Sequence, residues 1–388
     1  MLSWIEPRES GERPYQYILL EGAYNVKIAV IIGTRPQIIK SVPIIYQVLK
    51  KNLNLKIIHT GQHYNELMSD VFFKTFSISK PNVNLGVGSG SQGYQVGEII
   101  VRLEKVLMKD EPNIVIVPGD TNSALASAIT VAKLRIPLAH VEAGARCYDM
   151  KMQEEINRRI IDHVSSFLFA VSQNCVDNLM RENVLGEVIF SGDTMYEVYE
   201  MSSKKIAEND IVEKLGLKPK EYAVLTLHRE ENVENAEKLL RILKAVASIG
   251  IKVVFPIHPR TKRKLREFKV HTIGENLMII DPLDYFSMMK LVKESALVLT
   301  DSGGLQKEAF WSKVPCITLR EKTEWIETIR LGVNFLAGAN EDVIIKLAKR
   351  ILQNLDEFSK RFKNIENPYV NGDIKPSKAI VGAIRSLG

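Results

Sequence analysis

From Lys27 onward, short runs rich in valine and isoleucine alternate with longer amphipathic stretches, and this alternation constrains the fold more than any other feature. Strands that alternate with helices form parallel sheets through right-handed crossover connections. The pattern therefore predicts the α/β fold class. The expected strands lie within residues 27–32, 55–60, 113–118, 137–142, 167–172, 188–192, 222–227, 252–257, 277–281, 296–301 and 316–320.

The chain is long enough for two such sheets. At 388 residues it exceeds the size at which a single hydrophobic core usually stops growing. A stretch rich in lysine, glutamate and asparagine, residues 194–219, separates the first six expected strands from the last five. We therefore expect two doubly wound Rossmann-like domains that face each other across a central cleft. The expected parts are an N-terminal extension over 1–26, a first domain over 27–195 and a second domain over 196–366.

The composition narrows the class of protein. The formal net charge of +6 is spread along the chain without a basic block, which fits a small anionic ligand at least as well as a nucleic acid. No run approaches the about 18 apolar residues that span a bilayer, and residues 1–26 lack the apolar core of a signal peptide. Cys147, Cys175 and Cys316 are far apart and lack the spacing of a metal site. We therefore expect a cytoplasmic protein that binds neither nucleic acid nor membrane.

The segment ALVLTDSGGLQKEAF, residues 296–310, changes abruptly from a strand pattern to a helix pattern. Ser302, Gly303 and Gly304 lie at this change. The start of a helix carries unpaired N–H groups and the positive end of the helix dipole, and glycines let an anion approach those groups closely. The turn therefore suits a phosphate. A second interpretation stays open, in which Ser302 is an N-cap and the glycines only make the turn.

Other expected strands also end in polar residues, which a parallel sheet gathers at the edge where ligands bind. Arg35 follows the first strand, and Lys40 lies five residues later. Cations are unfavourable at the start of a helix unless an anion is bound, so this pair indicates phosphate recognition. His228 ends another strand and is followed by charged residues, so we expect it to face solvent or a ligand.

Three acidic residues accompany these cations. Asp120 follows a strand and also suits the role of an N-cap for the next helix, whereas Glu142 has no helix to cap. Glu154 and Arg158 lie four residues apart on one face of a predicted helix. Phosphate-binding groups combined with acids and a histidine are what nucleotide-sugar chemistry requires. The face of that helix that we expect to contact the core carries Ile156, Ile160 and Val164.

Eight motifs, in the same order, resemble the non-hydrolysing UDP-N-acetylglucosamine 2-epimerase family across residues 27–388. The resemblance implies the two-domain GT-B fold of glycosyltransferases, with a C-terminal helix over 367–388 that packs back on the first domain. It also implies a cytoplasmic homodimer that acts on a UDP-sugar and needs neither a metal nor a nicotinamide cofactor. The motifs are GTRPQIIK, TGQHY, GDTNS, HVEAGAR, EEINRR, TLHREEN, DSGGLQKEA and NPYVNGD.

The resemblance implies a role for each candidate residue. In one group, three acids would surround the sugar carbon that inverts and a histidine would lie beside the diphosphate, and a second group would bind the nucleotide. The first group consists of the catalytic residues Asp120, Glu142, Glu154 and His228. The second group consists of Arg35 and Lys40 at the phosphates, Arg158 beside the diphosphate, the backbone of Ser302, Gly303 and Gly304 around it, and Glu308 at the ribose hydroxyls.

The chain departs from the family pattern at a few positions. Gln37 and Gln153 replace a common glutamate and a common proline, and Trp325 replaces an arginine linked to substrate binding. Tyr94 and Gln95 stand where bacterial members place an arginine and a glutamine at a regulatory substrate site. The tryptophan form is also similar to the sister group that acts on UDP-2,3-diacetamido-2,3-dideoxyglucuronate.

The expected function is the interconversion of UDP-GlcNAc and UDP-ManNAc, through elimination of UDP to 2-acetamidoglucal and its re-addition. The alternative is 2-epimerisation of UDP-2,3-diacetamido-2,3-dideoxyglucuronate. A GT-B glycosyltransferase would share the nucleotide site but needs only one base. A non-catalytic nucleotide-sugar sensor would need hydrogen-bond donors but no set of acids and bases. The three acids therefore favour an epimerase.

Overall fold

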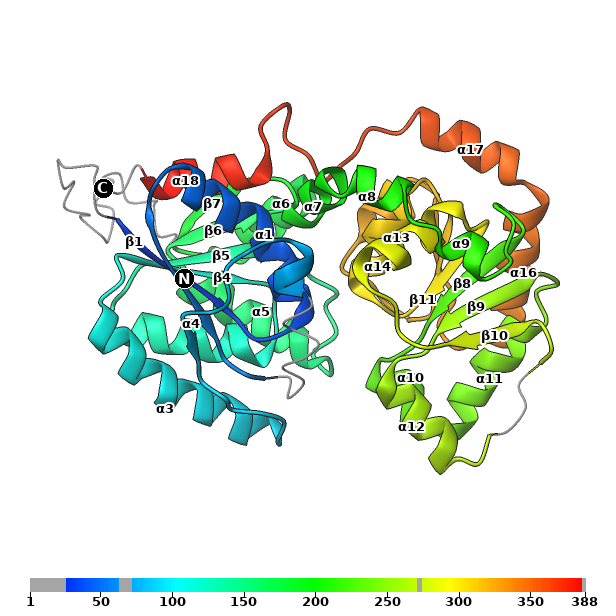
Figure 1. The fold of residues 1–388 in the computed structure, drawn as a ribbon, viewed down its shortest axis with the longest axis horizontal. Helices are drawn as coiled ribbons and strands as arrows, with labels where there is room; N and C mark the ends of the chain where they lie inside the picture. The colour runs from blue at the N-terminus through cyan, green and yellow to red at the C-terminus, as the bar shows by residue number, and fades with distance from the viewer. Residues whose placement is uncertain (1–25, 63–71, 271–273, 386–388) are drawn as a thin grey trace, which may run out of the picture.

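The structure, a computed structural model, describes residues 26–62, 72–270 and 274–385. It contains two parallel sheets, each covered by helices on both faces (Figure 1). Of the expected N-terminal extension over 1–26, all but Val26 lies outside the described residues, as do His63 and Tyr64 of the TGQHY motif.

The first sheet has seven parallel strands in the order β3-β2-β1-β4-β5-β6-β7. Its strands are β1 Lys27–Ile32, β2 Asn54–His59, β3 Val83–Asn84, β4 Ile114–Pro118, β5 Leu138–Ala143, β6 Phe167–Ala170 and β7 Glu187–Phe190.

The second sheet has six parallel strands in the order β10-β9-β8-β11-β12-β13. Both sheets therefore reverse their strand order after the third strand from one edge, which is the doubly wound topology. The strands of the second sheet are β8 Tyr222–Thr226, β9 Lys252–Pro256, β10 Leu277–Ile280, β11 Leu297–Thr300, β12 Cys316–Thr318 and β13 Asn334–Leu336.

Helices connect these strands. The helices of the first half are α1 Arg35–Lys50, α3 Gln92–Asp110, α4 Asn122–Lys133, α5 Gln153–Val164, α6 Gln173–Arg181 and α7 Thr194–Met201. The remaining helices are α8 Ser203–Ala207, α9 Ile211–Lys214, α10 Glu230–Val233, α11 Ala236–Ala247, α12 Pro259–Glu267, α13 Tyr285–Glu294, α14 Gly303–Trp311, α15 Ile326–Arg330, α16 Glu341–Gln353, α17 Leu355–Lys363 and α18 Pro376–Arg385.

Alternate residues of β1 point to opposite faces of the first sheet. Ile28, Val30 and Ile32 belong to a hydrophobic cluster with residues of α1 and α18, whereas Ala29 and Ile31 pack with residues of α3 and α4. Helices on both faces explain why this strand is an unbroken apolar run, since neither face meets water. The two helix layers are visible above and below the sheet in Figure 1.

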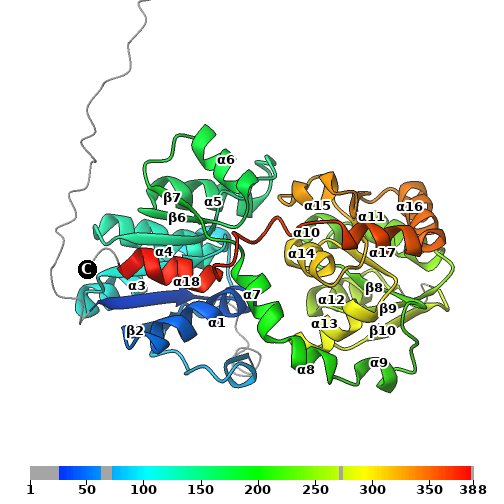
Figure 2. The ribbon, with the colours of Figure 1, turned by 90° about the horizontal axis from the view of Figure 1, so that it is seen from above.

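The chain passes between the two halves twice, through α7 and α8 and again through the segment that leads to α18 (Figure 2). α18 packs against α1 and α7, and its first turn is held by Glu197, which accepts hydrogen bonds from the backbone N and the hydroxyl of Ser377 at 2.9 and 2.8 Å. The helix expected over 367–388 begins only at Pro376, because residues 367–375 form turns and an isolated bridge. The domain boundaries at 195 and 366 remain predictions.

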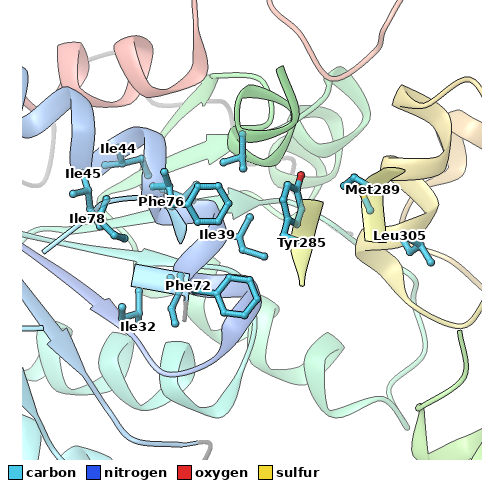
Figure 3. Close-up of a cluster of buried hydrophobic side chains, with 14 of the residues drawn as sticks. Ile32, Ile39, Ile44, Ile45, Phe72, Phe76, Ile78, Tyr285, Met289 and Leu305 are labelled. Carbon is cyan, nitrogen blue, oxygen red and sulfur yellow. The ribbon is translucent and has the colours of Figure 1, made fainter. Parts of the chain in front are cut away.

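One hydrophobic cluster joins the two halves. Ile39, Phe72 and Phe76 of the first half face Tyr285 and Met289 of the second half (Figure 3). The rings of Phe76 and Tyr285 lie 5.9 Å apart. This apolar contact fixes the position of the two sheets relative to each other, since it continues the core of one half into that of the other.

Each expected strand is present, and the predicted α/β fold of GT-B type is confirmed. The structure adds β3 and β13, which have two and three residues. The prediction that one face of α5 contacts the core through Ile156, Ile160 and Val164 is wrong, since Ile160 and Val164 are exposed and Ile156 is only partly buried. Among the helices that the structure describes, none combines the length and the apolar character needed to cross a bilayer.

Candidate active site

The predicted site residues follow the strands at which each sheet reverses its order. Arg35 comes after β1 and Asp120 after β4, and these strands are neighbours in the first sheet. His228 comes after β8 and Ser302 after β11, which are neighbours in the second sheet. Doubly wound sheets bind ligands beyond the carboxyl ends of such strands. The topology therefore brings candidate residues of each half to that half's expected binding edge.

Helix α14 begins at Gly303, within the predicted turn. Ser302 is its N-cap, and the Ser302 hydroxyl accepts a hydrogen bond from the backbone N of Leu305 at 3.5 Å. A Cβ atom on Gly303 would lie 2.5 Å from Oε1 of Glu324 and 3.3 Å from Nε1 of Trp325. Ser302 is thus an N-cap, and the glycine is needed where other groups approach the start of the helix closely. An anion at this turn stays a prediction.

Glu142 sits in a strained backbone conformation at the end of β5. Its φ of +76° lies in the left-handed region, and the pairing of β5 with β6 shifts register between Val141 and Ala143. A bulge of this kind redirects a side chain, and strain of this kind is typical of functional sites. Here it accompanies a carboxylate whose Oε1 lies 2.7 Å from Nζ of Lys40 and whose Oε2 lies 3.1 Å from Nζ of Lys307.

Lys307 extends this group. Its ammonium contacts Oδ2 of Asp193 at 2.5 Å and lies 3.8 Å from the ring centroid of Trp325. We call Lys40, Glu142, Asp193 and Lys307 the Glu142 cluster, and all four side chains are buried. Burial would raise the pKa of Glu142, but the ammonium groups of Lys307 and Lys40 lower it to about 2. The cluster is therefore a set of buried, mutually neutralised charges.

A second group of charges contains the other two predicted acids. Oδ2 of Asp120 lies 2.5 Å from Nη2 of Arg158, and Oε1 of Glu154 lies 2.5 Å from Nη1 of Arg229. Glu324 lies beside these pairs. We call Asp120, Glu154, Arg158, Arg229 and Glu324 the arginine cluster. Burial would raise the pKa of Glu324, but Arg320, Arg158 and Arg229 hold it well below its usual range. The Glu154–Arg229 pair joins α5 of the first half to the end of β8 in the second half.

Both arginines of this cluster keep a buried donor without a partner. The Nε groups of Arg158 and Arg229 have no hydrogen-bond partner among the described residues, and neither does Nε1 of Trp325. A buried N–H group that lacks a partner costs free energy, typically about 1–3 kcal/mol. Such donors are therefore suited to bind an anion that enters the site.

His228 lies beside the arginine cluster. Its backbone N donates to Asp301 at 3.0 Å, and its Nδ1 lies 3.3 Å from Oδ1 of the same carboxylate. The side chain is 34% exposed, in agreement with the prediction that it faces solvent or a ligand. Burial of the ring lowers the pKa of His228, and the negative charge of Asp301 offsets part of this effect. A neutral imidazole near neutral pH follows from this balance.

Arg35 and Glu308 lie near the Glu142 cluster. The guanidinium of Arg35 lies 4.7 Å from the ring centroid of Phe72. Burial lowers the pKa of Arg35, and the nearby Glu308 opposes that shift. Burial raises the pKa of Glu308 to about 7, although Arg35 and Lys307 act in the opposite direction. Glu308 is therefore poised between its neutral and charged forms near neutral pH.

Residues that the sequence suited to local contacts have other partners. Glu154 and Arg158 share a helix, but Glu154 pairs with Arg229, and Arg158 pairs with Asp120 and with Glu155 of the same helix. Asp120 does not cap α4, since Thr121 does so by accepting from the backbone N of Ala124. Gln37, which replaces a glutamate of the family pattern, accepts from the backbone N of Gly33 and donates to the carbonyl of Pro118. An ionised glutamate could not make the second bond.

Sequence reasoning missed four charged residues of the site, and it identified Trp325 only as a departure from the family pattern. Lys307 lies inside the quoted turn segment, Asp193 follows the strand end VIFSG, and Arg229 follows His228. Each of these three residues lies shortly after a strand or one turn into a helix. That position was the signal in the sequence that could have identified them as site residues. Glu324 and Trp325 follow no strand directly, and they are brought to α14 by the loop after β12.

Known proteins resemble this chain closely. A sequence profile of the family described as UDP-N-acetylglucosamine 2-epimerase matches residues 47–385. The chain is 42% identical over 358 residues to UDP-N-acetylglucosamine 2-epimerase of Methanocaldococcus jannaschii, which covers 89% of this chain and 96% of that protein. It is 38% identical over 335 residues to UDP-2,3-diacetamido-2,3-dideoxy-D-glucuronate 2-epimerase of Pseudomonas aeruginosa, which covers 84% of this chain and 92% of that protein.

Comparison of the fold with solved structures indicates the same family. The crystal structure of M. jannaschii UDP-GlcNAc 2-epimerase in complex with UDP-GlcNAc and UDP matches with a TM-score of 0.85 at 42% sequence identity. The match covers 92% of this chain and 99% of that one. The resemblance stated from the eight motifs is thereby confirmed. This chain belongs to the UDP-N-acetylglucosamine 2-epimerase family.

Proposed function

We propose that the protein interconverts UDP-GlcNAc and UDP-ManNAc without a redox cofactor. In the forward direction, the bond from C1 to the UDP oxygen breaks and its electron pair leaves with UDP. The proton on C2 passes to a carboxylate, and the C1–C2 double bond of 2-acetamidoglucal forms. Protonation of C2 from the opposite face and return of UDP to C1 give the epimer, so atoms and electrons balance.

The observation that supports this most directly is the Glu154–Arg229 pair, in which an acid of the first half meets a cation of the second half. Elimination of UDP requires acids near the sugar and cations near the leaving group at the same time. The family membership and the UDP-GlcNAc and UDP bound by the M. jannaschii enzyme support the same substrate.

The leaving diphosphate would be bound by groups of both halves. The backbone N–H groups at Ser302, Gly303 and Gly304 lie at the positive end of α14, and Arg158 retains a buried Nε–H donor that has no partner among the described residues. His228 would donate a hydrogen bond beside them from Nε2 in its protonated form, since its Nδ1 faces Asp301. These donors are worth more in a site that excludes water, and they stabilise the charge that develops as UDP departs.

Other residues would bind the rest of the nucleotide. Arg35 and Lys40 are the candidates for the phosphates on the side of α1. Glu308 would accept the ribose hydroxyls, and its pKa near 7 couples this contact to the release of a proton when the nucleotide binds. Asp120, Glu142 and Glu154 would handle the C2 proton, with one of them acting on each face of the sugar.

A second substrate is favoured by one observation. The P. aeruginosa relative, at 38% identity, is a UDP-2,3-diacetamido-2,3-dideoxy-D-glucuronate 2-epimerase. That sugar carries a carboxylate and a second acetamido group, but the C2 chemistry is the same. Parallel assays with the two UDP-sugars would separate these functions.

Proton NMR in heavy water tests the proposal. We expect UDP-GlcNAc incubated with the protein to give UDP-ManNAc that carries deuterium at C2, since the proton carriers exchange with solvent. A sensor would leave the spectrum unchanged, and a product that retains hydrogen at C2 would rule out deprotonation there. Turnover of the diacetamido sugar alone would move the assignment to the second substrate.

We also propose that the protein acts as a homodimer in the cytoplasm. Tyr94, Val101 and Met108 are exposed apolar side chains that recur every seven residues along α3. A stripe of this kind suits a contact between helices. The three cysteines of the chain are buried free thiols, which fits a reducing compartment. Sedimentation velocity would test the dimer.

A further inference from the structure

The ammonium of Lys307 connects the two halves through their most buried charges. Lys307 is on α14 of the second half, and its side chain is inaccessible to solvent. Its partners are Glu142 at the end of β5 and Asp193 just before α7. A buried charge requires such partners, so the pairing forms only when α14 lies against the first sheet.

We propose that Lys307 is a positioning residue, which reaches from the second half and holds the Glu142 carboxylate of the first half in place for the C2 proton transfer. This inference rests on the proposed function, because it gives Glu142 its role there. It differs from that function in assigning the task to a residue that does not touch the sugar or the nucleotide.

The contacts of Lys307 leave at most one N–H donor for a substrate. An ammonium group has three N–H donors. Two of them meet the carboxylates of Glu142 and Asp193, and the charge also lies 3.8 Å from the ring centroid of Trp325, within the range of a cation–π contact. By contrast, Glu142 is the one partner that the structure records for the Lys40 ammonium among the described residues. Lys40 can therefore turn to a phosphate, whereas Lys307 stays with Glu142.

The backbone of Glu142 explains why a second cation is needed. Its left-handed φ and the adjacent bulge aim the side chain away from the regular direction of β5. When Lys40 turns to the diphosphate, one oxygen of Glu142 loses its partner. Lys307 would then be the cation that holds the carboxylate in place.

The charges around Glu142 come from several elements. Lys40 faces it from α1 and Lys307 from α14, while Cys175 of α6 also lies within its electrostatic reach. Asp193 acts on it through Lys307. Without Lys307, burial is opposed by Lys40 alone, so the pKa of Glu142 should rise from about 2.

The test compares Lys307→Met with Lys346→Met, an exposed lysine on α16 that serves as the matched control. Methionine keeps the apolar stem against Trp325 but removes the charge. We expect kcat for UDP-GlcNAc to fall by about tenfold to 100-fold, the range of a misplaced catalytic group, while UDP affinity changes less than threefold. The acid limb of the kcat/KM profile should move to higher pH. The control should match the wild-type protein in all three measurements.

Carboxyl NMR of ¹³C-labelled glutamate gives a readout that needs no turnover. The Glu142 resonance, assigned by its loss in Glu142→Gln, should titrate at higher pH in Lys307→Met than in the wild-type protein. If Lys307→Met does not fold, the double variant Lys307→Met/Asp193→Asn removes both charges of the buried pair and takes its place.

The outcomes are separable. A wild-type protein that produces no epimer and no C2 label would contradict the proposed function, and the NMR titration would still decide whether Lys307 controls Glu142. An active wild-type protein together with an unchanged kcat, acid limb and Glu142 resonance in Lys307→Met would overturn the inference. A loss of UDP affinity equal to the loss of kcat would also overturn it, because Lys307 would then act on the nucleotide.

Discussion

The Glu142 cluster and the arginine cluster hold similar numbers of charges in different environments. In the Glu142 cluster, no side chain is more than 10% exposed. In the arginine cluster, Asp120, Glu154 and Arg229 are 24%, 31% and 22% exposed. Charges that water cannot reach must be neutralised by charged neighbours, whereas partly hydrated charges can exchange partners at lower cost. The first cluster is therefore preset, and the second is open to a ligand.

The largest effect should separate turnover from stability. Glu142→Gln and Asp120→Asn should each lower kcat by about 10²–10⁴-fold, because each removes a proton carrier. UDP affinity should be nearly unchanged, since neither residue would contact the diphosphate. Glu142→Gln should lower the urea midpoint more than Asp120→Asn, because it leaves Lys40 and Lys307 facing a neutral amide, whereas the carboxylate of Asp120 is partly exposed. Full activity of either variant would contradict the assignment of that residue as a proton carrier.

The next effect concerns stability alone. Asp193→Ala leaves the ammonium of Lys307 with one carboxylate and removes the N-cap of α7, so the free energy of unfolding should fall by about 3–5 kcal/mol. Asp210→Ala, at an exposed pair with Lys214, is the control and should change little. Urea denaturation measures both. Equal losses of unfolding free energy in the two variants would show that the buried Glu142 cluster contributes no more to stability than an exposed ion pair.

A smaller effect is expected for binding of UDP. Gly303→Val places a side chain against Glu324, where an anion would approach the start of α14, and Arg35→Ala removes a phosphate-binding cation. Each should weaken UDP by about 1.5–3 kcal/mol, or at least about tenfold in Kd. Calorimetry gives the affinity, with Arg330→Ala on α15 as a control. Unchanged Kd values in both variants would mean that the diphosphate binds elsewhere.

The smallest effect is a slope with pH. Burial raises the pKa of Glu308 from 4.5 to about 7, so the folded protein holds one proton more than the unfolded chain between these values. The contribution of Glu308 to stability should therefore be lost as pH rises through this window, at no more than about 1.4 kcal/mol per pH unit. The difference in unfolding free energy between the wild-type protein and Glu308→Gln should grow accordingly. A difference in unfolding free energy that does not depend on pH would contradict the raised pKa of Glu308.

Much of the fold followed from local patterns. Strands such as β1 and β8 are unbroken apolar runs because helices cover both faces, and runs of this kind are visible in a sequence. β3 and β13 could not be predicted, since two or three residues carry no period. The residues placed at strand ends were predictable for a related reason, because a parallel sheet aligns those ends whatever the details of its loops.

Failures occurred where charges replace apolar groups in the interior. The inward side of α5 carries Glu155, Arg158 and Asp162, which are buried in ion pairs, so the hydrophobic pattern marked the wrong face. The pattern of α14 predicts a solvent-exposed lysine at Lys307, but its side chain is buried and the two carboxylates that pair with it lie more than 100 positions earlier. Partners this distant in sequence leave no local signal.

The position of α18 has a consequence for synthesis of the protein. Ile380, Val381 and Ile384 belong to the same hydrophobic cluster as Ile28 and Val30, which lie near the opposite end of the described chain. Translation proceeds from the N-terminus, so the first sheet leaves the ribosome while one of the helices that covers it has not yet been made. The second half, whose strands and helices are contiguous in sequence, can complete its own core earlier. The half that is synthesised first is therefore the half that finishes folding last.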